Sequence, residues 1–247
     1  MLELQHLSFR VDAEGQDKEI LDDINLVIPN GKLIAITGPN GGGKSTTARI
    51  IAGIEKPTAG RILLDGQDVT ELGVTERARA GIAFAFQQPV RFKGIKVRDL
   101  IRLAAGKNIS TGEACSYLSA VGLCARDYID REVNASLSGG ELKRIEIATV
   151  LARGSRLSVF DEPEAGIDLW SFQNLIEVFQ NMRKNISDSS IVIISHQERI
   201  LNIADEIVVL AGGKIQKQGG RDEILPELLS SGAARQTCRG AVCGGAA

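Results

Sequence analysis

The stretch that decides the fold is Gly38-Pro39-Asn40-Gly41-Gly42-Gly43-Lys44-Ser45. It fits the phosphate-binding loop pattern, in which a glycine, four further residues and a second glycine precede a lysine and a hydroxyl residue. Glycines let backbone N–H groups converge on phosphates, while Lys44 reaches the β- and γ-phosphates and the Ser45 hydroxyl binds Mg²⁺. We therefore expect residues 38–45 to bind a nucleoside triphosphate, with Thr46 at the α-phosphate.

The sequence on either side has the strand and the helix that such a loop requires. Leu33 to Thr37 is apolar like a buried strand, and Ser45 to Ile54 places Ala48, Ile51 and Ala52 at helical spacing. The alternative interpretation is a glycine-rich turn that only caps a helix. A chance match to the pattern occurs at about one position in ten thousand for average composition, so the context favours phosphate binding.

The other segments predict an α/β fold with a mixed sheet core, an antiparallel β subdomain and an inserted α-helical subdomain. Alternating apolar residues indicate the first strands, and helical spacing from about residue 89 to 153 indicates the insertion. We expect this domain to span residues 1–229 and a disordered tail to span 230–247, where large apolar residues are few. The expected strands are Leu2–Val11, Ile24–Ile28, Leu33–Thr37, Arg61–Leu64, Ile82–Phe86, Leu157–Phe160, Ile191–Ile194, Ile207–Leu210 and Lys214–Lys217. The expected helices are Ser45–Ile54, Val97–Ala105, Thr111–Val121, Gly139–Ala152, Leu169–Arg183, Gln197–Ile203 and Asp222–Leu229.

The composition excludes several classes of protein. Lys and Arg total 29 against 31 Asp and Glu, so no strong field of one sign favours a nucleic acid partner. The apolar runs are shorter than the about 18–20 residues that cross a bilayer, so we expect no membrane insertion. The N-terminus lacks the pattern of a secretory signal, which favours a cytoplasmic location. Cys238 and Cys243 lack the Cys-x₂-Cys spacing of a structural zinc site, so we interpret them as exposed thiols.

Two adjacent carboxylates follow the apolar strand Leu157–Phe160. The carboxyl ends of parallel strands face the ligand crevice of an α/β sheet, so Asp161 is expected to bind Mg²⁺ and Glu162 to act as the general base or to orient the attacking water. The alternative is an acid-rich helix start, because Pro163 follows. The phosphate-binding loop earlier in the chain favours the catalytic interpretation.

The segment Leu137-Ser138-Gly139-Gly140-Glu141 resembles the signature of the ABC ATPase family, which normally ends in Gln, and lies between the loop and Asp161 as in that family. The resemblance implies an ABC-type P-loop fold. It also implies ATP binding and hydrolysis in a head-to-tail dimer, where Ser138 to Glu141 contact the γ-phosphate of the facing subunit. A simple capping box, with Ser138 bonded to the residue three positions later, fits the same sequence, and both interpretations can hold.

Three further positions are similar to motifs of that family. Gln87 resembles the glutamine that senses Mg²⁺ and relays to the partner, with Gln88 as a one-residue alternative. Asp168 resembles the aspartate of the loop after the catalytic strand. His196 resembles the switch histidine at the γ-phosphate. The resemblance covers about residues 1–228 and implies ATP and Mg²⁺ as cofactors.

The departures from the common ABC pattern point to a subfamily. Val11 stands where most transporter ATPases place an aromatic residue to stack on adenine, and Phe9 lies on the same face but earlier on the strand. The signature ends in Glu141. These departures, together with Gly166, the loop after Gln87 and the switch region that begins at Ser195, are similar to the SUF-type iron–sulfur cluster assembly ATPase. That ATPase acts on soluble scaffold subunits. Pro163 is more typical of transporters, so the alternative is the nucleotide-binding subunit of an ABC membrane transporter.

Two other classes of ATP-binding protein fit this sequence less well. A regulatory module that closes on ATP without hydrolysing it would have no chemical use for Glu162 and His196. A DNA-repair ABC ATPase would carry long coiled-coil or zinc insertions, which this sequence lacks, and no basic stripe suggests nucleic acid. We therefore predict an ATP-hydrolysing subunit that drives a partner.

Overall fold

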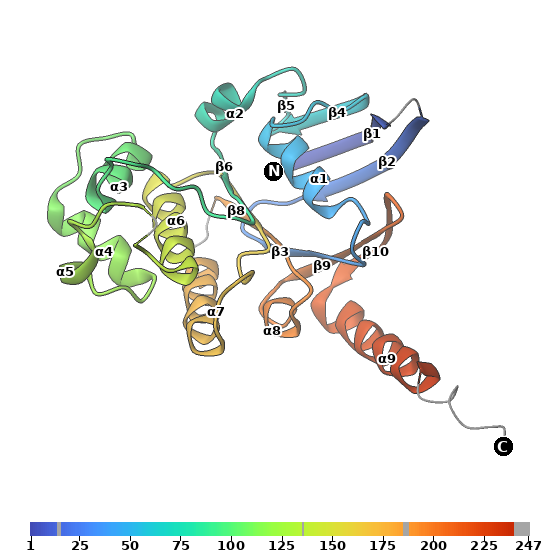
Figure 1. The fold of residues 1–247 in the computed structure, drawn as a ribbon. Coiled ribbons are helices and arrows are strands. Elements are labelled where there is room, and N and C mark those ends of the chain that lie inside the picture. Colours follow the sequence, from blue (N-terminus) through green and yellow to red (C-terminus); the bar gives the residue numbers. More distant parts are fainter. Residues whose placement is uncertain (14–15, 135, 185–187, 240–247) are drawn as a thin grey trace.

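The computed structural model describes residues 1–13, 16–134, 136–184 and 188–239. Within them the chain forms a four-stranded antiparallel sheet, ordered β2-β1-β4-β5, and a six-stranded sheet, ordered β10-β9-β3-β8-β7-β6 (Figure 1). In the larger sheet β10 is antiparallel to its neighbour and the other strands are parallel. The strands are β1 Leu2–Ala13, β2 Gln16–Ile28, β3 Leu33–Thr37, β4 Ala59–Leu64, β5 Gln67–Asp68, β6 Ile82–Ala85, β7 Leu157–Asp161, β8 Ser190–Ile194, β9 Glu206–Ala211 and β10 Lys214–Gly220.

The helices divide between the sheets and a separate lobe. Figure 1 shows α3 to α6 gathered on the opposite side of the molecule from the antiparallel sheet, with α1 close to that sheet. This helical subdomain is inserted between β6 and β7. The helices are α1 Lys44–Ala52, α2 Val74–Ala80, α3 Val97–Ala105, α4 Thr111–Ala120, α5 Ala125–Tyr128, α6 Gly139–Arg153, α7 Leu169–Lys184, α8 Glu198–Leu201 and α9 Arg221–Arg239.

Strand β3 is buried on both faces, and this position directs the loop that follows it. Leu33 and Ala35 join the core cluster that includes α6 and α7, whereas Ile34 and Ile36 join the cluster that includes α1 and the antiparallel sheet. Successive side chains of a strand point to opposite faces, so each face of β3 has its own core. The chain after Thr37 therefore leaves at the carboxyl edge of the parallel strands, where open α/β sheets bind ligands.

The predicted strands and helices are present, but several features differ. Helices α2 and α5 and strand β5 were not predicted. Strand β2 begins at Gln16 rather than Ile24. Helix α9 continues to Arg239, whereas a disordered tail was expected from residue 230. The helix covers residues 230–239 of that segment, and the domain boundary at residue 229 with the tail after it stays a prediction.

The last part of the predicted tail, residues 240–247 with Cys243, lies outside the described residues. In the part of the chain that the structure describes, no helix is both long and apolar enough to cross a membrane.

Candidate nucleotide-binding and catalytic site

An open pocket of about 620 Å³ lies at the carboxyl edge of the parallel strands. The loop after β3 and the start of α1 form its floor. Gln87, Glu162 and His196 come from three other segments and line the same pocket, so the structure brings these predicted catalytic residues together. The full lining is Lys18, Glu19, Ile20, Asn40, Gly41, Gly42, Gly43, Lys44, Ser45, Thr46, Gln87, Glu162, His196, Gly212 and Gly213.

The glycines of the loop are required by close backbone approach. Gly38 has φ = 140°, and a Cβ atom there would lie 1.9 Å from the carbonyl oxygen of Leu210 in β9. Gly43 has φ = 99°, and a Cβ atom there would lie 2.5 Å from a methyl group of Leu21. Only glycine fits such positions without strain. The loop is therefore held between β9 and β2.

Lys44 and Ser45 lie where phosphate and Mg²⁺ binding requires them. The Nζ atom of Lys44 donates to the carbonyl oxygens of Gly38 and Pro39 at 2.8 and 2.9 Å, so the ammonium is folded over the loop. Burial lowers the pKa of Lys44, while Glu162 and Asp161 act in the opposite direction. A phosphate group would add the opposite charge that this buried ammonium needs.

The predicted Mg²⁺ ligands already contact each other. The hydroxyl of Ser45 donates to Oδ1 of Asp161 at 2.9 Å, and burial raises the pKa of Asp161. A buried carboxylate beside a hydroxyl oxygen is a hard-ligand pair that suits Mg²⁺. Mg²⁺ commonly uses one or two carboxylates together with substrate phosphates, so these two residues would hold it together with the nucleotide.

Glu162 has the geometry of a constrained functional residue. Its φ is 43°, which is uncommon for a residue other than glycine, and its backbone N–H donates to Ile194 of β8 at 3.0 Å. The side-chain amide of Gln87 donates to Oε2 of Glu162 at 2.5 Å. The loop that leads from β6 to the helical subdomain is therefore bonded directly to the predicted catalytic carboxylate.

The signature residues lie apart from the pocket of their own chain. Ser138 caps α6, and Glu141 returns the bond through Oε2, which accepts from the Ser138 N–H at 2.6 Å. The Tyr128 hydroxyl also donates to Glu141. A guanidinium nitrogen of Arg131 lies 3.8 Å from Oε1 of Glu141. The capping-box interpretation is thus observed. Contact of Ser138, Gly139, Gly140 and Glu141 with a second subunit's nucleotide stays a prediction.

Asp168 likewise does not line the pocket. Its Oδ1 accepts a hydrogen bond from the backbone of Ser171 at 3.0 Å, near the start of α7. Its contribution to nucleotide binding, which the resemblance to the family implies, stays a prediction.

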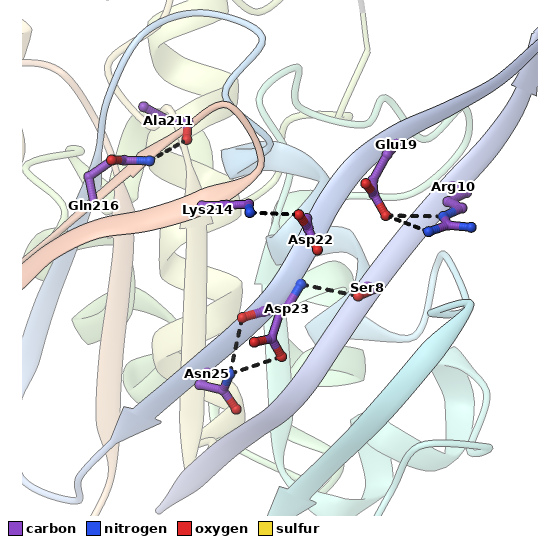
Figure 2. Close-up of polar contacts among 9 residues, drawn as sticks. All are labelled: Ser8, Arg10, Glu19, Asp22, Asp23, Asn25, Ala211, Lys214 and Gln216. Atoms are coloured by element: carbon purple, nitrogen blue, oxygen red, sulfur yellow. Dashed lines mark hydrogen bonds and ion pairs between the residues drawn. The ribbon is translucent and has the colours of Figure 1, made fainter.

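Sequence reasoning missed one wall of the pocket. This wall consists of Lys18, Glu19 and Ile20 from β2 with Gly212 and Gly213 from the β9–β10 turn. Figure 2 shows how β2 is tied to its neighbours: Lys214 bonds Asp22 at 2.8 Å, and Arg10 bonds Glu19. No aromatic side chain lines the described pocket, and Val11 is 41% exposed outside it.

The missed wall has a local cause. Asp23 has φ = 53°, and the pairing of β1 with β2 shifts register nearby, so the period-2 alternation is interrupted between Leu21 and Ile24. The strand was therefore expected to begin at Ile24. If one irregular residue is allowed at Asp23, the strand pattern continues back through Ile20.

Comparison with known proteins agrees with this geometry. The ABC transporter family matches residues 21–165. An uncharacterised ABC transporter ATP-binding protein, MJ0035 of Methanocaldococcus jannaschii, is 38% identical over 216 residues, covering 84% of this chain and 86% of that protein. The probable ATP-dependent transporter ycf16 of Cyanophora paradoxa is 34% identical, covering 94% and 93%.

Solved structures show the same fold. The dimeric, post-hydrolysis ATP-binding cassette MJ0796 with ADP and Pi has a TM-score of 0.80 at 22% identity, covering 90% of this chain and 99% of that one. A bacterial Atm1-family ABC exporter with ATP bound has a TM-score of 0.81 at 27% identity, covering 96% and 42%. The predicted ABC-type fold is confirmed, and the chain belongs to the ABC transporter family of ATP-binding proteins, as one of its ATPases.

Proposed function

We propose that two copies of this chain close head to tail on MgATP, hydrolyse it and pass the movement to a partner subunit. The observation that carries this proposal is the hydrogen bond from Gln87 to Glu162. Gln87 belongs to the segment that enters the helical subdomain, so the position of that subdomain and the position of the catalytic carboxylate depend on each other.

The residues of the pocket divide the chemistry among themselves. Glu162 accepts a proton from the attacking water, whose oxygen bonds to the γ-phosphorus as the bond to the β-phosphate oxygen breaks. Lys44 and the loop N–H groups stabilise the charge on the phosphates, and His196 contacts the γ-phosphate. Ser45, Asp161 and Gln87 would hold Mg²⁺, which neutralises phosphate charge. Ser138 to Glu141 of the second copy complete the site, which is why a dimer is required.

The dimeric MJ0796 structure with ADP and Pi supports this arrangement by similarity of fold. In the present chain the signature residues lie outside the pocket of their own subunit, as a site completed by a second copy requires.

An apolar groove is the proposed docking site for the partner. It has a volume of about 230 Å³ between α1, α2, β6 and the helical subdomain, and it begins beside Gln87. Val74 and Phe86 line it with 51% and 41% of their surfaces exposed. A helix with apolar side chains would cover these residues.

A membrane transporter is the first candidate for that partner. The relatives' names favour it: ycf16 is called a probable ATP-dependent transporter, and the import protein CysA of Synechocystis, of which this chain covers 60%, is 34% identical. On this proposal the groove holds a cytoplasmic helix of the transmembrane subunit.

A soluble SUF-type scaffold is the second candidate. One argument for it is Glu141, which replaces the usual glutamine and is hydrogen-bonded to Tyr128 and Ser138. The other is that no aromatic side chain lines the described nucleotide pocket. On this proposal ATP-driven closure moves two scaffold subunits and exposes their cluster-binding groups.

Affinity purification from soluble and detergent-solubilised fractions distinguishes the candidates. An integral membrane subunit would support the transporter, and a soluble β-rich protein that binds iron and sulfide would support the scaffold. Val74→Asp places a charge in the groove and should abolish capture, whereas Leu229→Asp, at an exposed apolar residue of α9, should not. Equal capture by both variants would contradict docking in the groove.

A further inference from the structure

A buried ion pair in α6 has no role in the chemistry described so far. Lys143 and Glu146 are three residues apart, with Nζ and Oε2 separated by 3.5 Å and side chains that are 2% and 14% exposed. Burial lowers the pKa of Lys143 and raises that of Glu146, and each partner opposes the other's shift. Burying two charges is costly unless further hydrogen bonds satisfy them, so the partners of this pair are informative.

Oε2 of Glu146 has no hydrogen-bond partner among the described residues. Oε1 of Glu146 and Nζ of Lys143 both form hydrogen bonds to one residue, Phe86. Its backbone N–H donates to Oε1 of Glu146 at 3.0 Å, and its carbonyl oxygen accepts from Nζ of Lys143. The pairing of β6 with β7 ends at Ala85, so Phe86 lies just past the sheet ladder. The ion pair of α6 therefore holds both polar backbone groups of the first residue after β6.

Phe86 joins three parts of the molecule. Its ring lines the apolar groove and packs edge to face on Phe84, with ring centroids 4.8 Å apart. Its backbone is bonded to α6, the helix that begins with the signature residues. The next residue, Gln87, is bonded to Glu162. A rotation of α6 would thus move the peptide that carries Gln87.

We propose that Lys143 and Glu146 are positioning residues for hydrolysis, which fix the backbone of Phe86 and thereby set the Gln87 side chain against Glu162. The helix that presents the signature to the facing subunit then also controls the catalytic carboxylate of its own subunit. This inference rests on the proposed roles of Gln87 and Glu162. A positioning role predicts that loss of the ion pair lowers kcat more than it weakens nucleotide binding, which a purely structural role does not predict.

The test uses the double variant Lys143→Met with Glu146→Leu in the full chain. Replacing a buried ion pair by apolar residues of similar volume is often neutral for stability, whereas removing one partner alone leaves an uncompensated charge. We expect amide hydrogen exchange at Phe86 to rise at least about tenfold. We expect kcat to fall at least about tenfold with KM for MgATP within about threefold, the pattern of a loss confined to the transition state.

Arg153→Met is the matched control. Arg153 lies on the same helix and joins it to α2 by a hydrogen bond to the backbone carbonyl of Ala78 at 2.6 Å, and among the described residues it makes no hydrogen bond to Phe86. This variant should keep wild-type exchange at Phe86 and wild-type kcat. Lys143→Met with Glu146→Gln also removes both charges but keeps an amide oxygen that can accept from the Phe86 N–H. It should lower kcat by a smaller factor, and it keeps the test decisive if the first double variant fails to fold.

Three results would overturn the inference: unchanged exchange at Phe86 in the double variant, unchanged kcat in a folded variant, or a loss of activity caused mainly by weaker nucleotide binding. Absence of turnover in the wild-type chain would instead contradict the proposed function. Exchange at Phe86 would then still decide whether the ion pair holds this backbone.

Discussion

Gly140 and Gly112 occupy the same position in two matching capping boxes. Ser138 and Glu141 open α6, Ser110 and Glu113 open α4, and in each helix the glycine is the second residue. A Cβ atom on Gly140 would meet no atom within 4 Å, and one on Gly112 would meet only the Ser110 hydroxyl, at 3.7 Å. Within its own chain, neither glycine is needed for space.

Gly140→Ala should therefore separate stability from catalysis. Alanine in a helix is favoured over glycine by about 0.5–1 kcal/mol, so both Gly140→Ala and Gly112→Ala should unfold at the same or higher denaturant concentration. Only Gly140→Ala should lower ATPase activity, by at least about tenfold, because its methyl group would enter the space between the signature and the facing nucleotide. Wild-type turnover in Gly140→Ala would argue against a head-to-tail site.

Glu162→Gln should trap the ATP-bound dimer. The amide keeps the size of the side chain but cannot take the proton, and loss of a general base typically lowers the rate by about 10²–10⁴-fold. Size-exclusion chromatography with MgATP should then show a dimer that persists, with ATP and not ADP bound. Glu177→Gln, at an exposed position of α7, is the control and should hydrolyse ATP normally. Normal turnover in Glu162→Gln would remove Glu162 from its assigned role.

Arg77 should be a principal stabilising residue of the nucleotide-binding region. Its guanidinium is fully buried and donates to the backbone carbonyls of Ile50, Ile51, Thr70 and Leu72. The bonds to Ile50 and Ile51 satisfy the end of α1, the helix that carries Lys44. Arg77→Met should lower the free energy of unfolding by about 2–4 kcal/mol, because several buried carbonyls lose their donors.

The matched control for that experiment is Arg79→Met, an exposed arginine on the same helix. Its effect should stay within about 0.5 kcal/mol in urea unfolding. Equal effects of the two substitutions would show that the buried hydrogen bonds contribute little.

Glu164 should make stability depend on pH in the direction opposite to an ordinary ion-paired carboxylate. Burial raises its pKa, the Ser195 hydroxyl partly opposes this, and Oε2 finds no hydrogen-bond partner among the described residues. The folded state then holds the proton more tightly than the unfolded state. This contribution to stability is full at low pH and is lost as pH rises from the unfolded pKa through the raised folded pKa.

Glu164→Gln keeps the hydrogen bond to Ser195 and removes the charge. It should raise the Tm above that of the wild type at pH 7, and the difference should shrink as the pH falls towards 4. Thermal unfolding of both proteins across this range measures it. A variant that is less stable than the wild type at pH 7 would show that the charged carboxylate is stabilising.

The grouping of the candidate site residues in one pocket was predictable because they lie in short continuous motifs next to strands. Residues 38–46 follow β3 directly, and Asp161 and Glu162 follow the apolar run of β7, so local pattern and parallel topology were enough. The Lys143–Glu146 pair was not predictable, because its partner Phe86 is distant in sequence and the bonds involve backbone atoms. The sequence Ser138 to Glu141 predicts both a contact with nucleotide and a helix cap. The structure of one chain shows the cap.

The insertion of the helical subdomain between β6 and β7 also has a consequence for how the chain folds. These strands pair side by side, although residues 86–156 separate them in sequence. Closing so long a flexible loop costs entropy that grows with its length. The helices of the insertion pack largely on one another, so their early formation would shorten the effective loop before β7 reaches the sheet. Slower folding on weakening α3 or α6, with unfolding rates little changed, would reveal that order of events.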